Sequence, residues 1–195
     1  MKRTTLLASL FAAAALSAAV SGAAFAQSAT YMVDPTHTFV TWEAKHFGVS
    51  TSRGRFDKKA GSITYDKAAK AGTAEITIDM ASISTGVAPF DGHLKSNDFF
   101  AAEQFPQAKF VGSQFKFDGD KLSEVVGELT LRGVTKPATL KATGFGCYDH
   151  PRLKREVCGG DFETTIVRSQ FDMKYGLPGI PDNIRLVVQV EAVKQ

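Results

Sequence analysis

Alternation of apolar and polar residues with a period of two runs along most of this chain and limits what it can fold into. In the segment 183–192, Ile184 and Leu186 fall on one face, while Arg185 and Gln189 fall on the other. Successive side chains of a β-strand point to opposite faces, so this pattern predicts a half-buried antiparallel strand. Seven further segments have strand character: 38–47, 53–66, 73–80, 108–117, 124–132, 134–145 and 160–169.

Gly-rich and Asp-rich turns separate these segments, and no long amphipathic helix competes with them. Only the stretch 89–105 is partly helical in character, because aromatics, acids and bases crowd there without a period of two. Eight alternating strands in a chain of this length fit either a closed barrel or a two-sheet sandwich. We therefore expect an all-β fold with a short helical segment near residues 89–105.

The expected interior mixes large and small side chains. Trp42 stands between Val40 and Ala44 on one face, and the inward face of 134–145 would include Ala142 and Gly144. Small residues could leave room for a guest, or could accommodate Phe side chains from the opposite wall. The chain has 15 Phe but only 4 Tyr and 1 Trp, which favours an interior resembling hydrocarbon.

The first 26 residues have the pattern of a secretory signal peptide. Lys2 and Arg3 precede an apolar run from Leu6 to Val20, and Ala24-Phe25-Ala26 suits a signal peptidase. A retained membrane anchor is the alternative, although the run is Ala-dominated and short. We expect cleavage after Ala26, a single barrel domain over residues 27–195, and a periplasmic location.

Without Lys2 and Arg3, 21 of the 23 Lys and Arg residues remain against 20 Asp and Glu. The remaining chain is close to neutral, so a broad basic field for nucleic acid is not expected. Its two cysteines, Cys147 and Cys158, are an even pair in an exported protein, which favours a disulfide at a hairpin end. A redox-active pair is the competing interpretation, but the close CxxC spacing is absent.

Motifs for metal binding and catalysis are missing. The histidines are His37, His46, His93 and His150. They form no HExxH motif and no cluster with cysteine, so we expect no metal site. There is no GxSxG and no phosphate-binding glycine loop, and acids such as Asp91, Asp98 and Glu103 are more often a helix face or cap than an acid and base pair. We predict a binding protein rather than an enzyme, with no cofactor.

The segment 92–100 combines His93 and Lys95 with the adjacent pair Phe99-Phe100. Such residues suit the mouth of a pocket that buries a hydrocarbon tail and leaves a polar head near water. An ordinary surface helix that closes one barrel end is the other interpretation.

Taken together, these stretches resemble the YceI family of polyisoprenoid-binding, lipocalin-like periplasmic proteins. The matching stretches are Tyr31-x-Val33-Asp34-x-x-His37-Thr38, Trp42 through His46-Phe47-Gly48, Gly54-x-Phe56, His93 through Phe100, Phe105-Pro106-x-Ala108-x-Phe110, Gly127 through Pro137, and Arg168-Ser169-x-Phe171. The resemblance covers nearly all of the chain after residue 30.

The resemblance implies an eight-stranded antiparallel lipocalin-like barrel whose apolar cavity holds a long-chain amphiphile for transport, storage or sequestration. The ligand would be an isoprenoid quinone, a polyprenyl phosphate or a fatty-acid derivative. We expect the following residues to contact it or to form the mouth: Val40, Trp42, His46, Phe47, Asp91, His93, Lys95, Asp98, Phe99, Phe100, Phe115, Ile166, Arg168, Phe171 and Met173.

Two alternatives remain beside simple binding. The protein could be an enzyme or electron-transfer accessory acting on a bound quinone, with His93 and Asp98 as proton donors. It could instead be a structural or stress-response protein whose interior is filled by its own Phe side chains.

Two stretches depart from the family pattern. Gln170-Phe171-Asp172 replaces the Asp-Phe-Gly run that often follows Arg168-Ser169, so the next loop could present a different surface. The hairpin 146–159 is a local elaboration with three bases. A stapled exposed hairpin is the main interpretation, and transient recruitment to an anionic membrane is the weaker one. A homodimer through an exposed strand edge stays open.

Overall fold

The computed structural model describes residues 28–195, so the expected signal peptide, residues 1–26, lies outside the described residues. The strands are β1 (Ala29–Val33), β2 (Phe39–His46), β3 (Ser50–Phe56), β4 (Lys59–Asp66), β5 (Ala71–Asp79), β6 (Ile83–Ser84), β7 (Gln107–Asp118), β8 (Lys121–Leu131), β9 (Val134–Asp149), β10 (Glu156–Val167) and β11 (Asn183–Lys194). The helices are α1 (Ala88–Lys95) and two 3₁₀ turns, η1 (Met80–Ser82) and η2 (Arg168–Phe171).

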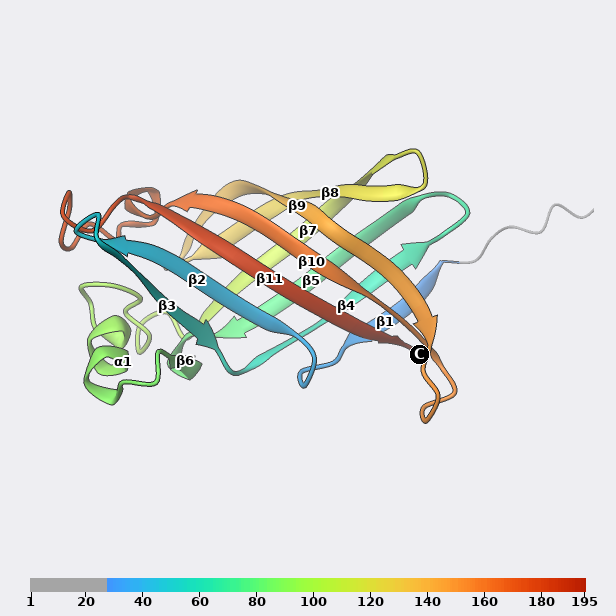
Figure 1. Ribbon diagram of the computed structural model, residues 1–195, viewed down its shortest axis with the longest axis horizontal. Coiled ribbons are helices and arrows are strands. Elements are labelled where there is room, and N and C mark those ends of the chain that lie inside the picture. Colours follow the sequence, from blue (N-terminus) through green and yellow to red (C-terminus); the bar gives the residue numbers. More distant parts are fainter. Residues whose placement is uncertain (1–27) are drawn as a thin grey trace, which may run out of the picture.

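Eight strands close into an antiparallel barrel, as the alternation and the family resemblance predicted. The order is β1-β4-β5-β7-β8-β9-β10-β11, and pairing of β1 with β11 completes the ring. Strands β2, β3 and β6 continue from β11 as a side sheet at one end, where α1 also lies (Figure 1). Closure satisfies the backbone groups of the ring and rules out the two-sheet sandwich.

Strand β11 is shared between two partners that follow each other in sequence. Its last residues pair with β1, with Val33 opposite Ala192, and its first half pairs with β2, with Trp42 opposite Leu186. The turn between β1 and β2 is held by Asp34, whose Oδ1 accepts a hydrogen bond of 2.8 Å from the Thr36 amide. The chain therefore leaves the ring after β1. The next strand, β2, pairs with the first half of β11 and belongs to the side sheet.

The prediction of one strand over residues 53–66 is wrong, because this segment belongs to two strands, β3 and β4. The break falls at Asp57 and Lys58, whose amides donate to the carbonyl and the hydroxyl of Ser82 at 3.0 and 2.9 Å. β3 pairs with β2, whereas β4 pairs with β1. A change of partner at the same bend cannot be seen in the alternation, which continues through it.

Three further differences concern short or irregular segments. The prediction did not count β1 or β6, which have five and two residues. Only residues 88–95 of the predicted helical stretch are α-helix, and turns follow up to residue 106. In β9 the register shifts opposite Asp161 and Phe162, so Phe145 lines the interior where the uninterrupted alternation had placed Gly144.

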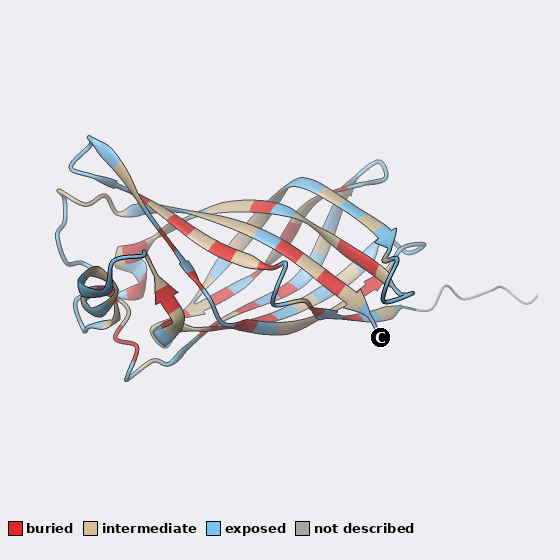
Figure 2. Cartoon of the chain, turned by 60° about the horizontal axis from the view of Figure 1, so that its bottom comes forward, coloured by how far each residue is buried: buried red, intermediate tan, exposed pale blue. Residues whose placement is uncertain are grey.

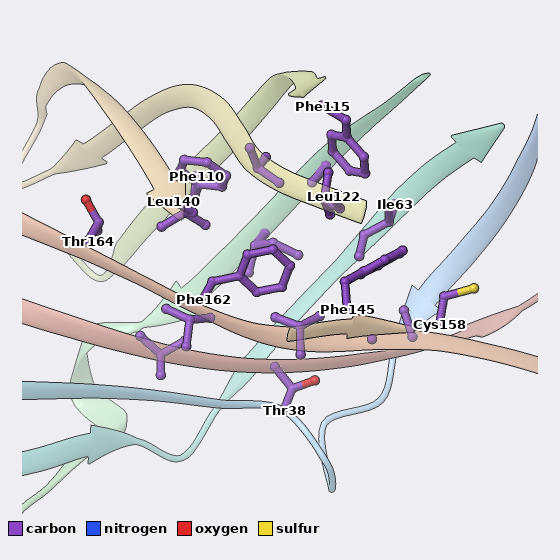
Figure 3. A pocket seen from close by; sticks show the side chains of 18 of the residues that line it. Thr38, Ile63, Phe110, Phe115, Leu122, Leu140, Phe145, Cys158, Phe162 and Thr164 are labelled. Carbon is purple, nitrogen blue, oxygen red and sulfur yellow. The ribbon is translucent and has the colours of Figure 1, made fainter. Parts of the chain in front are cut away.

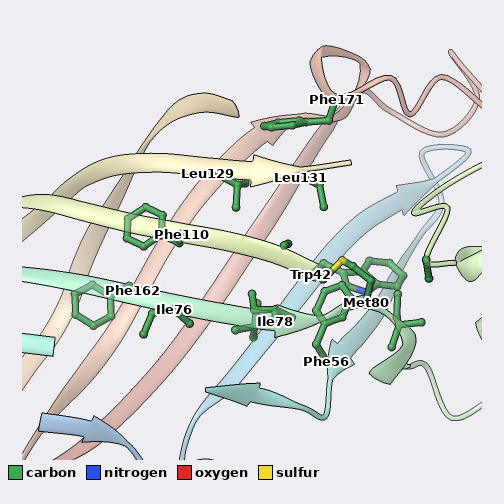
Figure 4. Packing of buried hydrophobic residues seen from close by; sticks show 14 of the residues in the cluster. Trp42, Phe56, Ile76, Ile78, Met80, Phe110, Leu129, Leu131, Phe162 and Phe171 are labelled. Atoms are coloured by element: carbon green, nitrogen blue, oxygen red, sulfur yellow. The ribbon is translucent and has the colours of Figure 1, made fainter. Parts of the chain in front are cut away.

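The barrel is lined by one large apolar cluster (Figure 4), and buried residues recur at intervals along the strands (Figure 2). Trp42 is 6% exposed, and its indole lies against the backbone of Gly54 on the neighbouring strand. A Cβ at Gly54 would lie 2.6 Å from the indole, so glycine is required there. Among residues 28–195, none of the helices has the length and apolar character needed to cross a membrane.

The predicted disulfide is confirmed. Cys147 and Cys158 are directly opposite each other on β9 and β10, with their Cα atoms 4.0 Å apart. The bond lies where the hairpin leaves the barrel, beside a small cluster that includes Tyr31 and Tyr65.

We expect replacement of both cysteines by serine to lower the free energy of unfolding by about 2–3 kcal/mol, because the bond restricts the unfolded chain. Urea unfolding followed by circular dichroism measures this loss. The native protein in reductant is the matched control, and it should unfold at the midpoint of the double variant. An unchanged midpoint in both samples would contradict a stabilising role.

Candidate ligand-binding site

Two adjacent apolar cavities lie along the barrel axis. The inner cavity has a volume of about 110 Å³, and the outer cavity about 850 Å³. Both are lined by Val40, Ile78, Leu129 and Leu186, so they meet at these residues. Figure 3 shows the inner cavity, with Phe110, Phe145 and Phe162 among its walls.

Aromatic side chains crowd one end of the inner cavity. The ring of Tyr65 is stacked with that of Phe117 at 6.4 Å and meets Phe145 edge-on at 5.7 Å. Tyr31 is 2% exposed, and its hydroxyl donates a 2.5 Å hydrogen bond to Glu156. Burial and this carboxylate raise the pKa of Tyr31 well above its usual value, so the phenol stays neutral.

The outer cavity opens at the other end, between the β2–β3 hairpin, α1 and the loop 172–182. Ten of the predicted residues line it: Val40, Trp42, His46, Phe47, His93, Phe99, Phe100, Ile166, Arg168 and Met173. An eleventh, Phe115, lines the inner cavity. The geometry thus gathers most of the predicted set around the two adjacent cavities.

Helix α1 and the turns after it place His93 and Phe99 at this mouth. Pro89 lies in the first turn of α1, and the Ser96 hydroxyl donates to the His93 carbonyl at the other end, 2.7 Å away. The His93 ring meets Phe99 and Tyr175 edge-on, at centroid distances of 5.0 and 5.1 Å. Helix and loop therefore meet through an aromatic cluster.

Four predicted residues lie outside the cavity walls: Asp91, Lys95, Asp98 and Phe171. Asp91 accepts hydrogen bonds from the amide and hydroxyl of Thr85, which lower the pKa of its carboxyl and tie α1 to β6. Asp98 Oδ2 lies 3.0 Å from His93 Nε2, so it contacts the site only through that ring. Phe171 is 2% exposed in the core.

Arg168 anchors the loop that forms part of the mouth. It is 3% exposed, and it donates to the carbonyls of Met173, Ile180 and Pro181 at 2.8, 2.9 and 3.0 Å. Burial lowers the pKa of its guanidinium, and nearby Asp182 opposes this effect. The side chain is thus a cation in the cavity wall whose bonds hold the backbone of the loop.

Arg132 has a similar positioning role between two of the stretches that carry the family resemblance. It begins the tight β8–β9 turn with Gly133, both at positive φ, and donates to the carbonyls of Asn97 and Phe99. The turns after α1 are therefore fixed from the far side by the β8–β9 turn.

Sequence reasoning missed several residues of the outer cavity, among them Phe56, Ile78, Met80, Tyr175, Ile180 and Ile184. The alternation of 73–80 and 183–192 carried a usable signal for Ile78 and Ile184. No sequence signal placed Tyr175 and Ile180, because the conformation of their loop depends on Arg168.

The remaining histidines and the possible metal ligands lie away from the outer cavity. His37 and Asp34 lie on the β1–β2 turn, where Nδ1 and Oδ2 are 2.7 Å apart. His150 Nδ1 accepts from backbone amides of the β9–β10 turn. Within residues 28–195 the one close group of possible metal ligands is Cys147, Glu156 and Cys158, and the disulfide removes both of its thiolates.

Comparisons with known proteins agree with this architecture. The YceI-like domain matches residues 31–192. The chain is 38% identical over 189 residues to a UPF0312 protein of Pseudomonas putida (strain W619), covering 95% of this chain and 97% of that one. It is 36% identical over 173 residues to the protein YceI of Escherichia coli O157:H7, with coverages of 87% and 90%.

A solved polyisoprenoid-binding domain from Saccharophagus degradans shares the fold, with a TM-score of 0.62 and 16% identity over 87% of this chain and 100% of that one. The fold, the family match over residues 31–192 and the full-length relatives agree, and the chain belongs to the YceI-like domain family.

Proposed function

We propose that this protein is a periplasmic carrier that holds a polyisoprenoid or similar long-chain amphiphile inside its barrel. The observation that carries the proposal is the pair of adjacent apolar cavities along the barrel axis, which share four lining residues. The Saccharophagus degradans domain with the same fold is described as polyisoprenoid-binding. The secretory pattern of residues 1–26 and the disulfide support a periplasmic location.

Protein interiors are normally close-packed, with few voids larger than a water molecule. A cavity of about 850 Å³ is instead typical of small-molecule sites, which span about 300–1,000 Å³. The adjacent cavity of about 110 Å³ is too small for a separate ligand but has room for the end of a chain. The self-filled barrel is therefore the weaker hypothesis, although aromatic side chains do crowd one end of the inner cavity.

Burial of hydrocarbon would supply most of the affinity. Each methylene moved from water into the cavity contributes about 0.8 kcal/mol. The walls offer few polar partners to the tail, so tail length should matter more than tail chemistry. Polar side chains at the mouth, including His46, Ser52 and His93, would face the head group.

The first test is extraction of the purified mature protein with organic solvent and mass spectrometry of the extract. We expect a long-chain isoprenoid or related lipid, and binding of added isoprenoid quinone or polyprenyl phosphate after delipidation. Recovery of no lipid together with failure to bind either class would sink the carrier proposal.

The second test narrows the cavity. Ala108 is 3% exposed and lines the outer cavity, so Ala108→Phe should displace part of the ligand chain. Loss of two buried methylenes corresponds to roughly a tenfold loss of affinity, measured by titration with a fluorescent isoprenoid. Ala60→Phe, on the exposed outer face of β4, is the matched control and should bind normally. Equal affinity of both variants would place the ligand elsewhere.

A second candidate function rests on the His93 and Asp98 pair at the mouth, which could exchange protons with a bound quinone. His93→Asn keeps a polar side chain but removes the imidazole ring that contacts Asp98. If the protein is an electron-transfer accessory, this variant should change the rate at which an added chemical reductant reduces the bound quinone, while quinone affinity stays intact. Altered affinity with no reduction to measure would favour simple binding.

A further inference from the structure

Exposed apolar side chains gather around the mouth of the outer cavity. Phe47 and Val49, at the tip of the β2–β3 hairpin, are 67% and 86% exposed, and Tyr175 and Leu177 of the loop 172–182 are 49% and 37% exposed. The tip and the loop are adjacent, since the Phe47 amide donates to the Gly179 carbonyl at 3.1 Å. Both lie at the same end of the barrel as α1 (Figure 1). Exposed apolar groups concentrated in this way mark an interaction surface.

The residues at the hairpin tip are not those that favour a stable two-residue turn. The Val49 amide closes the turn on the His46 carbonyl at 3.0 Å, and the two residues between them, Phe47 and Gly48, have φ of 49° and 74°. Asn, Asp or Gly usually fill the first of these positions, because a bulky side chain is disfavoured at positive φ. A large aromatic that is mostly exposed at this position is explained better by contact with another surface than by the turn itself.

The hairpin tip carries charge of one sign. Residues 44–52 contain Lys45 and His46 and no acid, whereas the loop 172–182 carries Lys174 between Asp172 and Asp182. Lys174 lies 3.2 Å from Asp172, whereas Lys45 has no carboxylate partner among the described residues. Aromatic and aliphatic tips flanked by cations suit the interface of an anionic bilayer.

We propose that this mouth surface, made of Lys45, Phe47, Val49, Lys174, Tyr175 and Leu177, docks on an anionic phospholipid bilayer. The proposal rests on the carrier function, because it says where the ligand enters. Phe47 and Tyr175 also line the outer cavity, so a docked mouth would let a tail pass from bilayer to barrel without crossing water.

The opposite end of the barrel offers a rival surface. Leu153, on the β9–β10 turn, is 50% exposed and is flanked by Arg152, Lys154 and Arg155. That turn extends beyond the disulfide, at the end where Tyr31 and Tyr65 are buried. Neither of the two cavities is lined by residues 150–155 of this turn, so docking there would not deliver a ligand to them. Leu153 therefore supplies a matched control.

The test is sedimentation of the full mature protein with vesicles of phosphatidylcholine alone or mixed with phosphatidylglycerol. We expect binding to the mixed vesicles, weakened by salt. Val49→Ser should lower the affinity roughly tenfold through lost apolar burial, and Val49→Asp should lower it further. Val49 lies outside both cavities, so after delipidation the variants should bind isoprenoid quinone added in solution with native affinity. Leu153→Asp should bind vesicles like the native protein.

No binding of the native protein to mixed vesicles would overturn the proposal, as would unchanged binding of Val49→Asp or an equal loss in Leu153→Asp. The two proposals fail separately. Vesicle binding through Val49, with no lipid recovered by extraction and no binding of added isoprenoid, would remove the carrier function alone. Lipid recovery without vesicle binding would remove the docking surface alone.

Discussion

The division of β11 between two partners is the constraint on which the rest of this structure depends. The C-terminal end of β11 pairs with β1 and closes the ring, and the first half of β11 pairs with β2. β3 and β4 repeat the division by pairing with β2 and β1. At the end where β1 and β4 complete the ring, side chains crowd the interior. At the end where β2 and β3 form the side sheet, α1 and the loop 172–182 complete the wall around a wider space.

Alternation in the sequence was enough to predict an all-β fold and most inward faces, because a half-buried strand shows its orientation in every second residue. Val40, Trp42 and Ala44 are buried as that pattern required. The alternation failed as a guide where a strand changes its partner or its register without a change in the pattern of residues. The bend at Asp57 keeps the period of two while the partner strand changes, and the bulge in β9 exchanges Gly144 for Phe145. Both depend on pairing between strands distant in sequence.

The site was predictable to the extent that strands and adjacent aromatics carry it. His93 and Phe99 were found because a cation or donor beside phenylalanine has an evident use at a pocket mouth. Asp91 and Lys95 share that segment but do not line the cavity, and in an eight-residue helix the spacing alone did not show which face is turned inward. Arg168 was expected at the ligand or the mouth, and it lines the outer cavity. Its hydrogen bonds to three carbonyls of the loop 172–182 were not expected, because the sequence did not show the path of that loop.

The distribution of polar groups gives the barrel a direction. The walls of the two cavities include no Asp or Glu, and the basic side chains Lys45, His46, His93 and Arg168 all line the outer cavity. Thr38 and Thr164 are among the residues that line the inner cavity, but the surface that they and their neighbours expose to it is apolar. A charged or polar head would lose its hydration at the inner end without gaining partners, whereas a hydrocarbon tail loses nothing there. An amphiphile is therefore expected to enter tail first and to keep its head at the mouth, where a bilayer interface would also hold it.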